Sequence, residues 1–385
     1  MQLDNINLET WFENAPADKF YNSKKIDYYG YYNTFKAEAE KYHKEVVALA
    51  NYREALDGNI VFLNDHGKDH IETVINRASD LVRSSVHCEL TPKEVYYLLT
   101  AIHFHDVGNL YGRINHVDDM RHIADKLDPF IKLDTIEKRH IKDIAEAHGG
   151  KLPNGSKDKI GKLPIVANTL EGDVRIQLLA AILRLADELS DDKNRCCDII
   201  VNDKEHFDNK SRAYHVYSSC LTCIAVEHSI KQIKLEFNIP LKFAQEKVRK
   251  DDTHVFVIDE IYERALKTLN ELIYTMRFTR GLIDLTSIMV RIKFVPEYIT
   301  LKPHEEPVLF KPHDDITFTL EEQGYPEYYA DIYSACPTLV KKDQNGESIS
   351  KKINDRIILP NNKKRWRLNK ILLSTTHLMQ FLQKM

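Results

Sequence analysis

Histidine and aspartate residues, the types that do acid–base and metal chemistry, interrupt apolar helical patterns at four places in the chain. Between Thr91 and Gly108 the apolar side chains recur at helical spacing and lead directly to the adjacent pair His105 and Asp106. Burying an imidazole and a carboxylate without partners is costly, so this pair needs either hydrogen-bonding groups or a metal ion. The sequence therefore predicts a polar site inside a helical core.

Three further stretches place the same residue types on an apolar helical face. His70, with His66 one turn before it, lies on the apolar side of a helix expected after residue 65. His148 ends the apolar side of a helix expected from Thr135, just before two glycines that should terminate it. Asp187 interrupts a nearly continuous apolar helix. Each residue alone is also explained as a hydrogen-bonded core residue, but together they indicate a nitrogen and oxygen site for a divalent ion such as Mn, Fe, Mg or Ni.

The helix that leads to His105 has a well-marked beginning. Thr91 can cap it, Pro92 suits its first turn, and Glu94 completes a capping-box signature. Gly108 is expected to end the helix just beyond the histidine–aspartate pair.

The order His70, then His105 and Asp106, then Asp187, each on its own helix, resembles that of the HD-domain metal-dependent phosphohydrolases. Three motifs carry the resemblance: His70-Ile-Glu-Thr-Val74, His105-Asp-Val-Gly108 and Arg184-Leu-Ala-Asp-Glu-Leu189. Asp65-His-Gly67 and the run ending at Asp187 resemble the HD domains of bacterial conflict and antiphage systems. The chain is therefore expected to belong to that branch of the HD domains. The resemblance implies that His70, His105, Asp106 and Asp187 hold one or two divalent metal ions per chain.

The resemblance also implies roles for residues around this ligand set. His116 and His148 resemble the additional histidines that hold a second metal in some HD branches, and either could instead give a proton to the leaving oxygen. His66 would orient a ligand rather than bind the metal itself. Asn109 to His122 reads as a loop over the substrate, with Arg113 on phosphate oxygens and His122 as a further contact, although a solvated helix start explains His122 equally well.

The function implied by the resemblance is hydrolysis of a nucleotide phosphate ester, with deoxynucleoside triphosphates (dNTPs) as the expected substrates and a second nucleotide as effector. The dNTP triphosphohydrolases place a catalytic histidine four residues after the HD histidine, where this chain has Asn109. A phosphodiesterase or nuclease for cyclic or short oligonucleotides is therefore the alternative. A non-catalytic nucleotide sensor is a second class, against which the complete ligand set argues.

We expect a mainly α fold, with a helical HD core, an appended small α+β unit and a mixed C-terminal region. The expected boundaries are residues 1–58 for an N-terminal helical arm, 59–199 for the HD core, 200–302 for an α+β regulatory or oligomerisation unit, and 303–385 for the C-terminal region. After Cys196 the pattern changes to period two, which predicts a hairpin-like sheet. A helix is expected to follow from Ile258 to Met276, and then another strand from Ile288 to Phe294. Pro303 to Pro312 is expected to be a linker.

Composition narrows the class of protein further. With 385 residues, 43% hydrophobic and 29% charged, the chain has the composition of an ordinary globular protein of two or three domains. A net charge of -4 predicts no general affinity for duplex nucleic acid. No apolar run approaches about 18 residues and the first residues do not resemble a secretory signal, so we expect a cytoplasmic protein that is not bound to membranes. We also expect the protein to form a homo-oligomer.

Two features of the sequence favour packing over chemistry. Four tyrosines between residues 28 and 32 precede a helix expected from Thr34 to Leu56; they could stack on bases, but packing onto the core or a second subunit is the preferred interpretation. Cys220 and Cys223 have a zinc-like spacing, but only one such pair occurs among the six cysteines. We therefore interpret the cysteines as packing residues.

Overall fold

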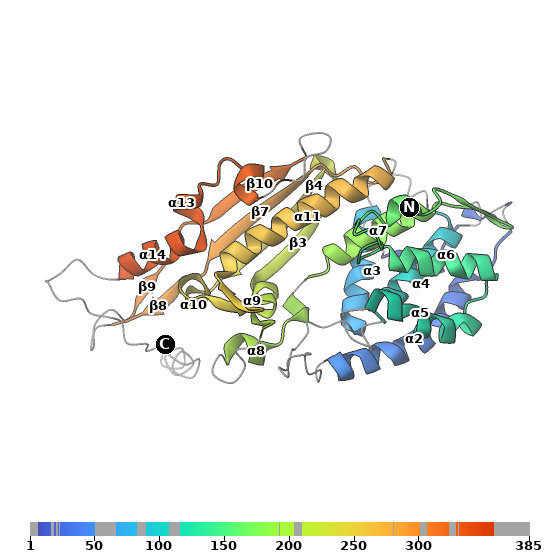
Figure 1. Cartoon of the computed structure of the whole chain (residues 1–385), viewed down its shortest axis with the longest axis horizontal. Coiled ribbons are helices and arrows are strands. Elements are labelled where there is room, and N and C mark those ends of the chain that lie inside the picture. Colours follow the sequence, from blue (N-terminus) through green and yellow to red (C-terminus); the bar gives the residue numbers. More distant parts are fainter. Residues whose placement is uncertain are drawn as a thin grey trace.

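The computed structural model describes residues 7–16, 19–20, 22, 24–50, 67–82, 90–107, 116–191, 193–203, 210–279, 281–300, 306–322, 329 and 331–357, with only the backbone of 46–50 and 116–119. A helical core lies at one end of the molecule and a unit built on a β-sheet lies at the other (Figure 1). The expected fold class, mainly α with an appended α+β unit, is confirmed.

The helical core consists of helices packed around one that is buried on every side. Its elements are α1 (Leu8–Glu13), α2 (Tyr28–Ala50), α3 (Lys68–Val82), α4 (Pro92–Phe104), α5 (His116–Leu127), α6 (Thr135–Glu146), α7 (Ile176–Glu188) and the hairpin of β1 (Ala167–Thr169) and β2 (Gly172–Val174). Every residue of α4 is buried, including Lys93 and Glu94. Both have partners, because Lys93 pairs with Glu137 of α6 and Glu94 accepts from Arg175 at 2.8 Å. Burial of these charges is therefore compensated.

The beginning of α4 is as predicted, but its end is not. Thr91 accepts from the backbone N–H of Glu94, and the Glu94 carboxylate accepts from the backbone N–H of Thr91, which completes the capping box. The helix ends at Phe104, and His105 and Asp106 form the turn that follows. The helix thus ends two residues before Asp106, so the prediction that it carries both residues is wrong, and the expected terminator Gly108 lies outside the described residues.

The tyrosine-rich segment packs onto the core. Helix α2 begins at Tyr28, earlier than the predicted Thr34, so the tyrosines occupy its first turns. The ring centroids of Tyr28 and Tyr96 lie 5.8 Å apart, and those of Phe35 and Phe104 lie 5.2 Å apart. The interpretation of these aromatic residues as packing residues is confirmed, since α2 covers α4 with them.

The second unit is a four-stranded sheet with one long helix packed on it. The strands are β3 (Leu221–Glu227), β4 (Gln232–Ile239), β7 (Ser287–Phe294) and β10 (Ile316–Glu321), in the order β10-β7-β4-β3. Strands β3 and β4 form the predicted antiparallel hairpin, while β4 and β7 run parallel and are joined through α11 (Val257–Thr279). The register pairs Ile233 with Ile288, which puts both on the buried face under α11.

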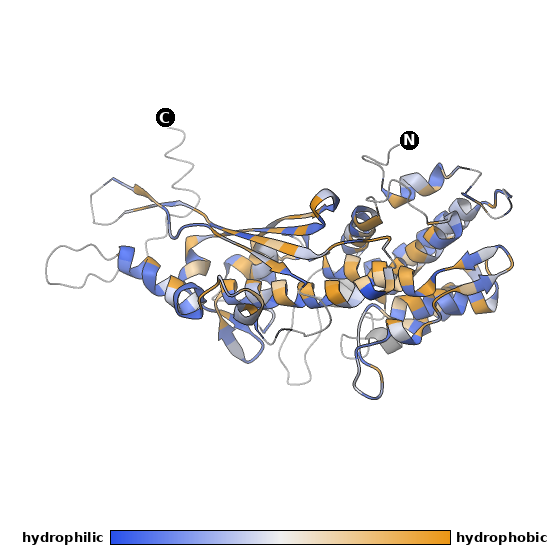
Figure 2. Cartoon of the chain, turned by 90° about the horizontal axis from the view of Figure 1, so that it is seen from above, coloured by the Kyte–Doolittle hydropathy of each residue, from blue (hydrophilic) through white to orange (hydrophobic). Residues whose placement is uncertain are grey.

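The other face of this sheet has no described helix over it. In Figure 2 the helices of the unit lie on one side of the strands. Residues that point the other way along β4 and β7, such as Lys234 and Arg291, are only partly buried. None of the helices in the part of the chain that the structure describes is both long and apolar enough to cross a membrane.

Shorter elements complete the second unit: α8 (Asp198–Asn202), α9 (Arg212–Cys220), α10 (Leu241–Gln245), β5 (Val248–Lys250), β6 (Thr253–Val255), β8 (Glu297–Ile299), β9 (Val308–Phe310), α12 (Ile332–Ala335), α13 (Lys341–Gln344) and α14 (Gly346–Ile357). Cys220 is buried at the end of α9 and Cys223 is exposed in β3. The segment predicted as a linker contains β9, which pairs with β8, and β10 beyond it joins the main sheet. The sheet unit therefore draws strands from both sides of residue 302.

Candidate metal centre

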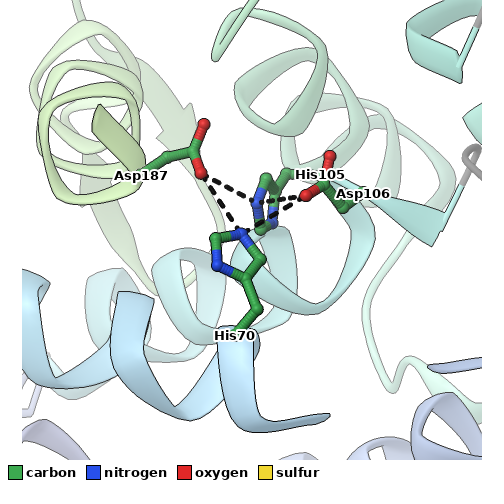
Figure 3. Close-up of side chains that lie close together, drawn as sticks. All are labelled: His70, His105, Asp106 and Asp187. Carbon is green, nitrogen blue, oxygen red and sulfur yellow. Dashed lines mark ion pairs between the residues drawn. The ribbon is translucent and has the colours of Figure 1, made fainter. Parts of the chain in front are cut away.

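Four of the predicted residues meet inside the helical core. His70 comes from the first turn of α3, His105 and Asp106 from the turn after α4, and Asp187 from the last turn of α7 (Figure 3). One ligand atom from each lies within 4.8 Å of all the others. Both histidine side chains are fully buried, while the side chain of Asp187 is 27% exposed.

The distances among these atoms fit a single divalent cation. His70 Nε2 lies 3.3 Å from both Asp106 Oδ2 and Asp187 Oδ1, and His105 Nε2 lies 3.4 Å and 3.5 Å from the same two oxygens. Ligands that each bind a metal at about 2.1 Å lie roughly 3.0–3.5 Å from their neighbours around it. Two imidazole nitrogens and two carboxylate oxygens also form a donor set that binds Mn, Fe or Ni better than it binds soft ions.

A hydrogen bond to the backbone orients the His105 ring for this role. Its Nδ1–H donates to the carbonyl of Ile102 at 2.6 Å, so Nε2 is the nitrogen that faces the carboxylates. Such a bond fixes both the rotation of the ring and the nitrogen that is available to a cation.

The imidazole of His105 and the nearby carboxylates shift each other's pKa. Burial lowers the pKa of the His105 imidazole, but the carboxylates of Asp106 and Asp187 outweigh burial and hold that pKa well above its usual value. Burial likewise raises the pKa of Asp187, but hydrogen bonding with His105 and His70 outweighs it and keeps the pKa well below the ordinary range. Because a ligand imidazole must be neutral, a metal ion entering this site would displace the proton from His105.

His148 lies beside the four residues but outside their cluster. Its ring is perpendicular to that of His105, with the centroids 5.0 Å apart, and its Nδ1–H donates to the carbonyl of Ala145 at 2.5 Å. The predicted helix ends at Glu146, before His148, and the chain turns at Gly150 with a φ of 73°. His148 is therefore held by the turn that follows α6.

The other predicted site residues lie elsewhere or outside the described residues. His116 is the first residue of α5, and its side chain is outside the description, as are His66 and Arg113. His122 is exposed on α5. The prediction of a loop up to His122 is wrong from His116 onward, because this segment forms an amphipathic helix that buries Met120, Ile123 and Ala124.

The structure also shows ion pairs beside the cluster that the sequence interpretation did not predict. Helix α7 carries Arg184, Glu188 and, just past its end, Asp191, and each forms an ion pair with a residue of α11. Their spacing of four and three residues on an otherwise apolar helix was the available signal, because it places all three on one side. Their partners on α11 could not be read from that spacing.

A comparison with known protein families identifies the family of this chain. The family model HD-CE matches residues 50–272, which is more than half of the 385-residue chain. The chain belongs to the HD-CE family. The match covers α3, α4, α6 and α7 and continues into α11. No curated protein and no solved structure matches the chain. The family and the His/Asp cluster together fit a metal-dependent HD hydrolase.

Proposed function

We propose that this protein is a metal-dependent phosphohydrolase that acts on nucleotides, with dNTPs as its substrates. The observation that carries the proposal is the convergence of His70, His105, Asp106 and Asp187 within the part of the chain that belongs to the HD-CE family. A divalent ion bound there would lower the pKa of a water molecule and polarise the phosphate ester.

The residues of the chain divide the remaining work. His70 and His105 present imidazole nitrogens to the metal ion, while Asp106 and Asp187 supply two negative charges that attract it. His148, next to His105, gives a proton to the leaving oxygen or completes a second metal position together with His116. Arg113 and His122 hold phosphate oxygens in this proposal.

Burial and charge favour a small substrate over a long nucleic acid. Both histidines of the cluster are fully buried, and Asp187 is the most exposed of the four residues, so access is from the side of α7. A largely buried centre of this kind suits a nucleotide. The net charge of -4 disfavours binding along a duplex, for which a basic surface supplies most of the affinity.

Chromatography of nucleotides incubated with the Mn-loaded protein tests the proposal. All four dNTPs and all four NTPs are supplied singly and as a mixture, because an enzyme that needs a nucleotide effector is inactive on each substrate alone. We expect one or more dNTPs to be converted to a deoxynucleoside or a deoxynucleoside monophosphate with release of the remaining phosphates. The His105→Ala variant is the control for contaminating phosphatases.

Two other outcomes would identify the alternatives. Cleavage of cyclic dinucleotides or single-stranded oligonucleotides, with every dNTP intact in the mixture, would favour a phosphodiesterase. Nucleotide binding without any turnover in the presence of Mn, Mg, Fe or Ni would favour a sensor. Either result would contradict dNTP hydrolysis.

We further propose that residues 200–302 regulate the enzyme by binding a nucleotide effector or by forming a homo-oligomer, and that the protein acts in the cytoplasm in antiphage defence. Support for regulation comes from the site itself, because the group of metal-ligand residues found in the described part of the chain lies wholly within the helical core. Light scattering of the full chain with and without dNTPs tests the oligomer. A monomer under both conditions, with turnover that does not depend on a second nucleotide, would contradict regulation.

A further inference from the structure

Helices α7 and α11 run antiparallel, and three ion pairs cross between them. In order along α7 the pairs are Arg184 with Glu271, Glu188 with Lys267, and Asp191 with Arg264. The first and second pairs have N–O distances of 2.6 Å and 2.7 Å. Together they attach the long helix of the sheet unit to the helix that carries Asp187.

The three cations of these pairs differ in how many partners each one has. Arg184 also donates to the carbonyl of Lys157, and Arg264 also pairs with Glu260 at 2.8 Å. Lys267 forms a single ion pair among the described residues, and its side chain is 59% exposed. Lys267 is therefore the cation of this set that can reach a ligand without abandoning a second partner.

Lys267 pairs with the residue that directly follows Asp187, the most exposed member of the cluster. Its partner Glu188 directly follows Asp187, so one turn of α7 directs one carboxylate to the histidines and the next to α11. Asp191 lies within electrostatic range of both sides: burial raises the pKa of its carboxyl, but Arg264, Arg195 and Lys267, with His70, outweigh burial and lower it.

The carboxylates at the end of α7 require cations nearby if an anion is to approach the metal centre. Asp187, Glu188 and Asp191 place three carboxylates along the end of α7, and Asp187 lies within 4.8 Å of Asp106 in the cluster. A polyphosphate would be repelled by these carboxylates unless cations offset them. The HD-CE match extends to residue 272, so Lys267 belongs to the same family unit as the cluster.

We propose that Lys267 binds a phosphate oxygen of the substrate beside the metal centre, so that the sheet unit contributes a side chain to the active site. The inference rests on the proposed function and specifies how the substrate is held. An ammonium group has three N–H donors, so Lys267 can keep its bond to Glu188 while it donates to phosphate.

Binding of inorganic phosphate to the full-length, Mn-loaded protein tests this role by calorimetry, independently of turnover. Lys267→Met should weaken phosphate binding about tenfold, because a charge-assisted hydrogen bond is lost. Lys267→Arg should recover most of the affinity, since it restores the charge. The matched control is Arg277→Gln, which removes a 38% exposed cation from the same helix and should leave phosphate affinity unchanged.

A double variant separates ligand binding from support of the structure. Lys267→Met alone leaves the largely buried Glu188 carboxylate without its cation and should lower the melting temperature. Lys267→Met with Glu188→Gln should recover the melting temperature but still bind phosphate weakly. A double variant that binds phosphate as tightly as the wild type would overturn the inference, as would a wild-type protein that binds no phosphate.

The nucleotide panel distinguishes failure of this inference from failure of the proposed function. If the wild type hydrolyses dNTPs and Lys267→Met has an unchanged KM, the proposed function stands and the role of Lys267 is wrong. If phosphate binding depends on Lys267 but no nucleotide is hydrolysed, the phosphate contact stands and the proposed function is wrong.

Discussion

The guanidinium of Arg184 donates two parallel hydrogen bonds to the carboxylate of Glu271, from Nε to Oε2 at 2.6 Å and from Nη2 to Oε1 at 3.0 Å. The same guanidinium lies over the ring of Tyr274, 4.3 Å from its centroid. This two-point contact joins α7 to α11 just one turn before Asp187. The helix that carries Asp187 of the candidate metal centre is thus attached to a helix of the other unit.

Arg184→Met is expected to destabilise the protein by roughly 3 kcal/mol, because it leaves the Glu271 carboxylate largely buried without its cation. Replacing both partners, in Arg184→Met with Glu271→Leu, should recover most of this loss. Urea unfolding measures both. The control is Arg121→Gln, since Arg121 is 46% exposed and its pairs contribute at most about 1 kcal/mol. Equal losses in the single and double variants would contradict the prediction.

His105→Ala and Asp106→Ala should each abolish bound transition metal and hydrolysis, because two adjacent side chains serve the same ion. Helical content should change little, since both residues lie in the turn after α4 and not within a helix. Metal content by plasma emission and circular dichroism are the measurements, with the exposed His122→Ala as the matched histidine control for metal content. Turnover at the wild-type rate in either variant would exclude the cluster as the metal centre.

If His148 and His116 complete a second metal position, His148→Ala should lower the metal content from about two ions per chain toward one. The His148 ring lies beside His105 without joining the four-residue cluster, so the first ion should remain. Metal content per chain after dialysis decides between the two roles. An unchanged ratio combined with a slower reaction would instead identify His148 as a proton donor.

Local patterns in the sequence predicted most of the site. The capping residues Thr91 and Glu94 fix where α4 begins, and the apolar stripe of α3 fixes the inward direction of His70. Period-two alternation likewise predicted β4, and β7 was expected as a further strand. Each of these signals is contained within a few residues, because side-chain direction in a helix or strand follows from the backbone period alone.

What the sequence did not predict depends on contacts between distant segments. The end of α4 at Phe104 is not marked by a glycine, and a local bond from His105 to Ile102 shapes the turn instead. The partner of Glu188 on α11 and the place of β10 in the main sheet involve residues far apart in the chain. Patterns of spacing give the face on which a residue lies, but not what that face meets.

Acid should destabilise the fold through His43 of α2, a buried residue whose Nε2–H donates to the carbonyl of His103 at 2.9 Å. Its Nδ1 is buried and has no hydrogen-bond partner among the described residues. Burial lowers the pKa of His43 from 6.5 to about 4, although the bond to His103 partly opposes this shift. The folded protein therefore holds His43 neutral in a range of pH where the unfolded chain protonates it. His43 stabilises the fold fully above pH 6.5, and this contribution, up to about 3 kcal/mol, is lost as the pH falls toward 4.

Unfolding by urea in excess chelator at pH 7.5 and at pH 5 should show a larger loss of stability for the wild type than for His43→Gln. The glutamine amide can still donate to the His103 carbonyl but does not titrate. Equal losses in the two proteins would mean that His43 takes up its proton in the folded state.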